Sequence, residues 1–171
     1  MRAAAVEPGL ARAKIYGSLV GVVACWRWAL IPVLAVVAYA SVLRIGFLAD
    51  DVGLLQTAQA HTNPFDALVP IPRWYFYRPV GTFLTWEIGW DMWGLNPVPY
   101  HLLGLFLHAA VSLVLALWAA ELSGKKWLGW LAGALFAVYP LHLEAVGWLS
   151  AQWDEWAALF GLLSVLFFTR W

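Results

Sequence analysis

Charged side chains are scarce in this sequence. They make up 12% of its 171 residues, about half the share found in soluble domains, whereas 63% of the residues are hydrophobic. That balance favours a membrane protein over a soluble domain. The ten basic and ten acidic side chains cancel, so the chain lacks the net positive charge with which proteins hold nucleic acids. We therefore expect no nucleic-acid partner.

Cysteine is almost absent. The single Cys25 excludes a disulfide within the chain, and the four His residues occur without a Cys cluster that would indicate a zinc site. Aromatic residues, in contrast, are abundant, with 13 Trp, 6 Tyr and 9 Phe. Because Trp and Tyr favour membrane–water interfaces, we expect the chain to meet the headgroup layer several times.

Four apolar runs predict an all-α fold, a polytopic bundle of about four membrane-spanning helices. The runs at 28–48 and 100–122 are each long enough to cross about 30 Å of hydrocarbon. The runs at 127–139 and 156–168 hold 13 residues each, and we expect them to form the third and fourth spans. Residues 28–171 then make one membrane module that follows a basic N-terminal segment, 1–27.

Basic residues divide unevenly between the flanks of these runs. With the N-terminus in the cytoplasm, seven lie inside and three outside, as expected because cytoplasmic loops retain positive charge. Most acids then face the periplasm of a bacterial inner membrane, or an equivalent compartment. A cleaved signal peptide is the alternative for the first run, since Ala38-Tyr39-Ala40 resembles a cleavage site.

The connection between the first two runs is a long outer loop, residues 49–99. Aromatic residues recur in it at helical spacing, at Phe83, Trp86, Trp90 and Trp93. A second apolar stripe is formed by Leu84, Ile88 and Met92. We expect a short amphipathic helix lying flat in the outer interface, with its aromatic side in the interface and the second stripe against the spans.

Two acidic residues stand directly after the first run. Asp50 and Asp51 lie at a membrane border, where an unpaired carboxylate is costly and ionisable residues indicate function. The alternative is a solvated helix end in which one acid faces Arg44. We take Asp50 and Asp51 as candidate catalytic residues.

A second polar group follows the short run at 127–139. His142 and Glu144 come just after Pro140, and irregular backbone at that depth must be buried in protein or line a water-filled cavity. We expect a cavity that opens outward near the acidic pair, with packing as the alternative role for His142. Arg78 of the outer loop could clamp a phosphate or snorkel to lipid headgroups.

Other polar residues are expected to have structural roles. His101, His108 and Ser112 share one face of the second span, which predicts hydrogen bonds between helices. Asp154 and Glu155 precede the fourth run, where acids complement the helix dipole, so we expect them to cap that helix.

Three motifs follow one another along the chain. The first is Phe47-Leu48-Ala49-Asp50-Asp51; the second combines Tyr77-Arg78-Pro79 with Trp93-Gly94-Leu95-Asn96-Pro97 and Tyr100-His101; the third is Tyr-Pro-Leu-His-Leu-Glu-Ala-Val-Gly-Trp-Leu-Ser at 139–150. Together they resemble the N-terminal part of lipid-dependent glycosyltransferases of the type C fold, most closely the tetratricopeptide-repeat O-mannosyltransferases and their bacterial relatives. The sequence departs from that pattern at Tyr139, where the family has His, and at Gln152-Trp153, where it tends to have Gly-Arg.

The resemblance implies transfer of a sugar, a hexose such as mannose, from a polyprenyl-phosphate donor to a hydroxyl of a protein or glycan acceptor. Asp50 or Asp51 would be the base that deprotonates this hydroxyl. Arg78 and His142 would stabilise the departing phosphate, and Glu144 would position His142 or the acceptor. A divalent cation is possible, because acidic pairs bind such ions in some relatives, and metal use stays open.

Family members usually continue through further spans, so we expect this chain to be the N-terminal portion of such an enzyme. The first alternative is a non-catalytic membrane subunit or truncated paralogue of the same fold. The second is a haem-handling membrane protein, in which His101 and His142 ligate the iron beside the Trp-rich segment 86–93.

Overall fold

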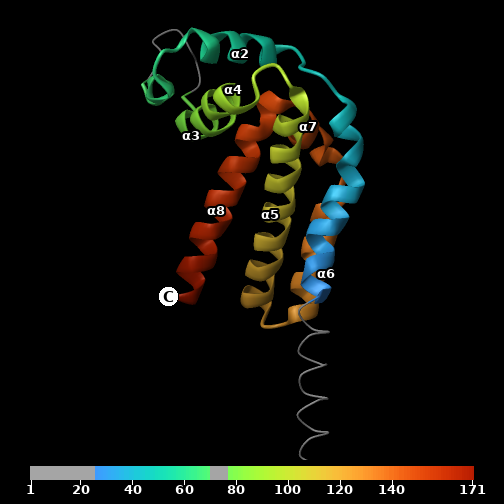
Figure 1. Ribbon diagram of the computed structural model, residues 1–171. Coiled ribbons are helices and arrows are strands. Elements are labelled where there is room, and N and C mark those ends of the chain that lie inside the picture. The colour runs from blue at the N-terminus through green and yellow to red at the C-terminus, as the bar shows by residue number, and fades with distance from the viewer. Residues whose placement is uncertain (1–25, 70–76) are drawn as a thin grey trace, which may run out of the picture.

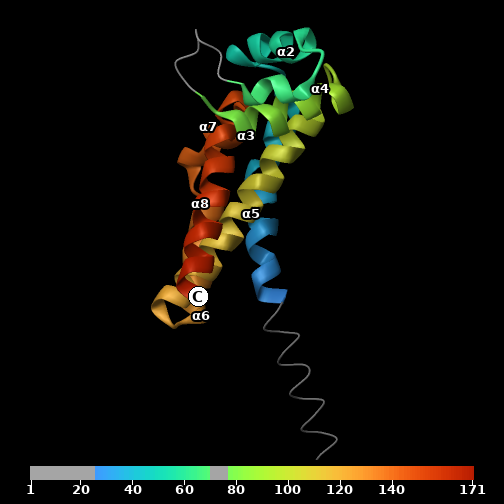
Figure 2. The same cartoon turned by 90° about the vertical axis from the view of Figure 1, so that its left-hand side faces the viewer.

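The computed structural model describes residues 26–69 and 77–171 of the chain. Within these ranges it is helical, without strands, which confirms the all-α class. Long helices run side by side, and the short helices of the outer loop cover one end of them (Figure 1). The view in Figure 2 shows the same two layers from the side.

Helix α5 (Pro97–Ser123) is the central element of the bundle. It begins where the Asn96 side chain accepts a hydrogen bond from the backbone N–H of Val98, and it ends at Gly124, which adopts a left-handed φ of 66°. The first helix, Trp26–Arg44, ends in a 3₁₀ turn, η1 (Ala40–Arg44), and packs on α5. Helices α6 (Lys126–Ala137) and α8 (Gln152–Arg170) also pack against it.

Among the described residues, two helices are long and apolar enough to cross a membrane: the first helix and α5. A third crossing results if α6 and the segment Pro140–Gly147, which are bent by 50°, form one span. The four expected spans are therefore confirmed only in part. Helix α8 has 19 residues but opens on Gln152, Asp154 and Glu155, which lower its apolar character. Between α6 and α8 lie η4 (Pro140–His142), α7 (Leu143–Gly147) and η5 (Leu149–Ala151).

The outer loop folds into several short helices. These are α2 (Asp50–Ala60), η2 (Pro64–Leu68), α3 (Pro79–Gly81), the π-helix η3 (Thr82–Glu87) and α4 (Ile88–Trp93). Residues 82–93 are helical, but the orientation expected for them is wrong. Trp86 is fully buried and packs with Trp93 on Tyr100, whereas Met92 is 67% exposed. Large aromatic rings remove more apolar surface from water than the stripe that contains Met92, so the aromatic side faces the bundle.

Helices α5 and α6 approach each other closely because two glycines face α5. A Cβ atom added at Gly133 would lie 2.4 Å from the Ala116 Cβ, and one added at Gly129 would lie 2.4 Å from the Ala116 carbonyl oxygen. The two glycines are four residues apart, the spacing with which small residues bring membrane helices together. Sequence reasoning missed this pair, although its spacing is readable.

A buried polar contact joins α5 to α8. The Nδ1 atom of His108 lies 2.9 Å from Oε1 of Glu155, and both side chains are buried. The hydrogen bond between helices expected for His108 is thereby confirmed, whereas the Ser112 hydroxyl donates within its own helix, to the His108 carbonyl oxygen. The capping role expected for Glu155 is wrong, because its carboxylate turns into the bundle and satisfies His108.

Replacing Gly133 with Val tests the close contact between α5 and α6. The added side chain overlaps Ala116, so we expect a loss of about 1–3 kcal/mol in the free energy of unfolding. Gly161→Val on α8 is the matched control, because a Cβ atom there meets nothing within 4 Å. Thermal unfolding in detergent, followed by circular dichroism, measures both. Equal unfolding temperatures for the two variants would contradict the role of Gly133.

Candidate functional site

Asp51 lies at the centre of the candidate site and is completely buried. Its Oδ1 accepts hydrogen bonds from the backbone N–H of Ser150, at 2.8 Å, and from the Ser150 hydroxyl, at 2.5 Å. Its Oδ2 accepts a hydrogen bond from the backbone N–H of Leu48, at 2.8 Å. A buried carboxylate with three donors is well satisfied. Asp51 thus fixes the start of α2 to η5, 99 residues further along the chain.

Asp50 differs from its neighbour because its side chain is exposed. It is the first residue of α2, and the residue before it, Ala49, has a φ of 42°. Among the described residues, Ala49 alone combines a positive φ with a Cβ atom. Such a conformation costs about 1–3 kcal/mol and persists only where surrounding contacts impose it. The hydrogen bonds of Asp51 to Leu48, which precedes this turn, and to Ser150 supply that constraint, and the Asp50 side chain stays exposed.

Arg78 lies over the indole ring of Trp153, with its guanidinium carbon 4.6 Å from the ring centroid. Trp153 belongs to the first turn of α8, three residues after Ser150. Arg78 and Trp153 also line a cavity of about 320 Å³, together with Tyr77, Pro79, Val80, Gly81, Asp154, Trp156, Ala157 and Phe160. The cavity therefore combines one guanidinium group, of Arg78, and one carboxylate, of Asp154, with mostly apolar walls.

The segment 149–153 brings the expected acidic pair and Arg78 to the same part of the fold. Ser150 donates a hydrogen bond to Asp51, and the guanidinium group of Arg78 lies over the indole ring of Trp153. The side chain of Gln152, which lies between them, donates from Nε2 to the Tyr100 carbonyl oxygen at 2.9 Å and fixes the segment to α5. Sequence reasoning missed Ser150, although it ends the third motif.

His142 and Glu144 do not join this group. The Nδ1 atom of His142 lies 3.1 Å from the Phe136 carbonyl oxygen, and its ring lies 5.1 Å from the His108 ring. It therefore turns toward the bundle interior. Glu144 is exposed, and no hydrogen bond joins it to His142 in the described part of the chain. The positioning of His142 by Glu144 is not seen in this structure.

Glu87 is a buried acid of the outer loop. It lies on η3, is 3% exposed, and its Oε1 is 2.9 Å from Nδ1 of His61 at the end of α2. Burial raises the pKa of Glu87 above its ordinary value of 4.5, and the hydrogen bond to His61 offsets part of that rise. This contact fixes α2 to the helical segment that carries Trp86.

The described residues contain no group of three or more His, Cys, Asp or Glu side chains arranged to hold a metal ion. The possible divalent cation at Asp50 and Asp51 therefore stays a prediction.

The chain is similar in sequence to several protein O-mannosyl-transferases. It is 38% identical to TMTC2 of Mus musculus over 94 residues, which are 55% of this chain and 11% of the relative. It is 32% identical to TMTC3 of Homo sapiens over an alignment of 145 positions, gaps included, which covers 77% of this chain and 16% of the relative. It is 29% identical to Tmtc1 of Drosophila melanogaster over an alignment of 176 positions, gaps included, which covers 96% of this chain and 20% of the relative.

The chain thus spans between 11% and 20% of the length of these relatives. No family model matches the sequence, and no solved structure matches it. The expected relationship to O-mannosyltransferases is confirmed over part of the chain, and the type C fold stays a prediction.

Stability measurements should separate the two adjacent acids. Asp51→Ala leaves the Leu48 N–H and the two buried donors of Ser150 without their partner, so we expect it to lower the free energy of unfolding by about 2–4 kcal/mol. Asp50→Ala is the matched control, and an exposed residue is expected to change that free energy by less than about 0.5 kcal/mol. Thermal unfolding in detergent measures both. An Asp51 variant as stable as wild type would refute the role of this carboxylate in joining α2 to η5.

Glu87 predicts a pH dependence of stability. Because its pKa is raised in the folded state, that state binds more protons than the unfolded state above pH 4.5. Its contribution is complete below pH 4.5 and is lost as the pH rises through the folded-state pKa. We expect Glu87→Gln to unfold near the wild-type temperature at about pH 4 and above it at about pH 7. A constant difference between these two pH values would contradict the prediction, and exposed Asp50→Asn is the control.

Proposed function

We propose that this chain is part of a membrane O-mannosyltransferase and carries its catalytic base and a phosphate-binding Arg. In this proposal a hexose such as mannose passes from a polyprenyl-phosphate donor to a hydroxyl of a protein acceptor, at the face covered by the outer loop. The observation that carries the proposal is the division of labour at the acidic pair: Asp51 is buried and held by three hydrogen bonds, and Asp50 is left exposed beside it. Similarity to protein O-mannosyl-transferases supports the same reaction class.

Asp50 is the base in this proposal. Its carboxylate takes the proton of the acceptor hydroxyl, whose oxygen attacks the anomeric carbon of the sugar. The bond between that carbon and the phosphate oxygen breaks, and the phosphate leaves with the electron pair. Because a phosphate is a good leaving group, the reaction needs a base more than a strong acid. Asp51 is completely buried and its carboxylate already accepts three hydrogen bonds, so it acts as a positioning residue.

Arg78 is the partner of the departing phosphate. A guanidinium group suits phosphate because it offers several N–H donors in one plane, and stacking on Trp153 fixes that plane. The resemblance placed an Arg at the position that Trp153 occupies. In this chain the positive charge is that of Arg78 in the outer loop, whose guanidinium group stacks on the ring of Trp153. The apolar walls of the adjoining cavity, among them Trp156 and Phe160, suit the first isoprene units of the lipid.

Several details stay predictions. The roles expected for His142 and Glu144 in binding are among them, as are the orientation of the N-terminus toward the cytoplasm and the use of a divalent cation. The non-catalytic alternative predicts that the natural protein, in its own membrane, transfers no sugar from a polyprenyl-phosphate mannose donor.

An activity assay tests the base directly. In membranes that contain the natural protein and radiolabelled polyprenyl-phosphate mannose, we expect Asp50→Asn to lower transfer to protein by about 10²–10⁴-fold, the range that a positioned base contributes. The unfolding temperature should not change, because this side chain is exposed. Asp66→Asn, which removes another exposed acid of the outer loop, is the matched control. Wild-type transfer by the Asp50 variant would refute the assignment of the base.

A further inference from the structure

The end of the bundle opposite the outer loop is rich in basic residues. Arg27 lies in the first described turn of the first helix there, Lys125 and Lys126 lie where α6 begins, and Arg170 ends α8 (Figure 1). Glu121 is the acid nearest to them on α5, and it is already engaged, with Oε1 2.6 Å from Nη2 of Arg170. Arg27 and Lys126 have no acidic partner within the described ranges.

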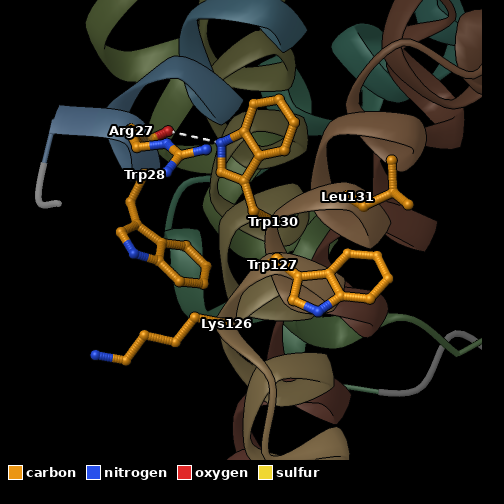
Figure 3. A pocket seen from close by; sticks show the side chains of 6 residues that line it. All are labelled: Arg27, Trp28, Lys126, Trp127, Trp130 and Leu131. Carbon is orange, nitrogen blue, oxygen red and sulfur yellow. Dashed lines mark hydrogen bonds between the residues drawn. The ribbon is translucent and has the colours of Figure 1, made fainter.

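A pocket of about 400 Å³ opens at this end, between the first helix and the start of α6. Six residues line it: Arg27, Trp28, Lys126, Trp127, Trp130 and Leu131. In Figure 3, Arg27 and Lys126 lie toward opposite ends of the pocket, with indole rings between them. The lining thus holds two positive charges, three Trp side chains and no acid.

Contacts between the two helices hold the walls of the pocket in place. The indole Nε1 of Trp130 donates to the Arg27 carbonyl oxygen at 2.8 Å, which joins α6 to the first helix (Figure 3). Trp28 and Trp130 also pack against the core cluster that contains Ile31 and Ala137. The pocket is therefore part of the helix packing, and its shape does not depend on a ligand.

The start of α6 adds a further positive contribution. Lys125, the N-cap residue, makes no side-chain hydrogen bond to the first turn. The first N–H groups of a helix have no partner within the helix and carry a partial positive charge. An anion seated beside Lys126 would meet these groups as well as the ammonium group.

We infer that this pocket binds the phosphate of an anionic phospholipid from the leaflet at this end of the bundle. The first helix and α5 are apolar enough to cross a membrane, so their ends lie at headgroup depth, where Trp side chains are favoured. The positive charges of Arg27 and Lys126, at the two ends of the pocket, both attract a phosphate diester, and the indole rings between them cover the glycerol and first acyl carbons. A zwitterionic headgroup would bring its own cation near Arg27 and Lys126, so it binds less well.

Lipid binding to the detergent-purified chain tests this inference. Phosphatidylglycerol is titrated into the protein, and bound lipid is counted by native mass spectrometry, with phosphatidylcholine as the comparison lipid. We expect wild type to prefer phosphatidylglycerol, and the double variant Arg27→Gln, Lys126→Gln to bind it about 25-fold more weakly, about fivefold for each charge removed. Lys125→Gln is the matched control, because it removes an adjacent charge that does not line the pocket.

The outcomes separate the possible sources of binding. Equal losses for the double variant and for Lys125→Gln, after correction for charge number, would mean attraction to general surface charge and would overturn the site. Equal affinity of wild type for the two lipids would overturn it as well. If inorganic phosphate displaced phosphatidylglycerol at matched concentration, the pocket would be a site for free phosphate and the lipid would be the wrong occupant. Circular dichroism of both variants checks that the helices are intact.

Discussion

The arrangement of the candidate site depends on one buried carboxylate. Asp51 collects hydrogen bonds from Leu48 before it and from Ser150 far along the chain, and so it holds the first turn of α2 against η5. An unpaired carboxylate at this depth would be costly, and three donors remove that cost. The strained turn at Ala49 persists because Asp51, which follows it, is hydrogen-bonded both to Leu48, which precedes it, and to Ser150. The Asp50 side chain stays exposed.

The bundle beneath the site joins its helices by two different means. Gly129 and Gly133 let α6 approach α5 until backbone meets backbone, where packing and not the removal of apolar surface from water provides the attraction. On the other side, His108 and Glu155 join α5 to α8 through a hydrogen bond in an apolar interior, where neither group finds another partner of equal strength. The contact of His108 with Glu155, together with the hydrogen bond from Gln152 to the Tyr100 carbonyl oxygen, holds the start of α8 against α5.

The two ends of the molecule have opposite chemistry. The end covered by the outer loop carries the exposed Asp50 and the buried acids Asp51 and Glu87, whereas the other end carries basic residues and Trp side chains. A helical protein that meets a membrane at both ends can use each for a different phosphate. In our proposals, Arg78 binds the phosphate of the sugar donor at one end, and Arg27 with Lys126 binds a structural lipid at the other.

Composition and periodicity by themselves determined the helical class, the first two apolar helices, the helical segment at 82–93 and the residues of the acidic pair, because each depends on local pattern alone. Tertiary structure decided which way these elements face. Trp86 turned inward and Met92 outward, Glu155 became the partner of His108, and His142 turned away from the acidic pair. Which side of a helix is buried depends on contacts between residues far apart in sequence, such as Asp51 with Ser150. No local sequence pattern specifies such contacts.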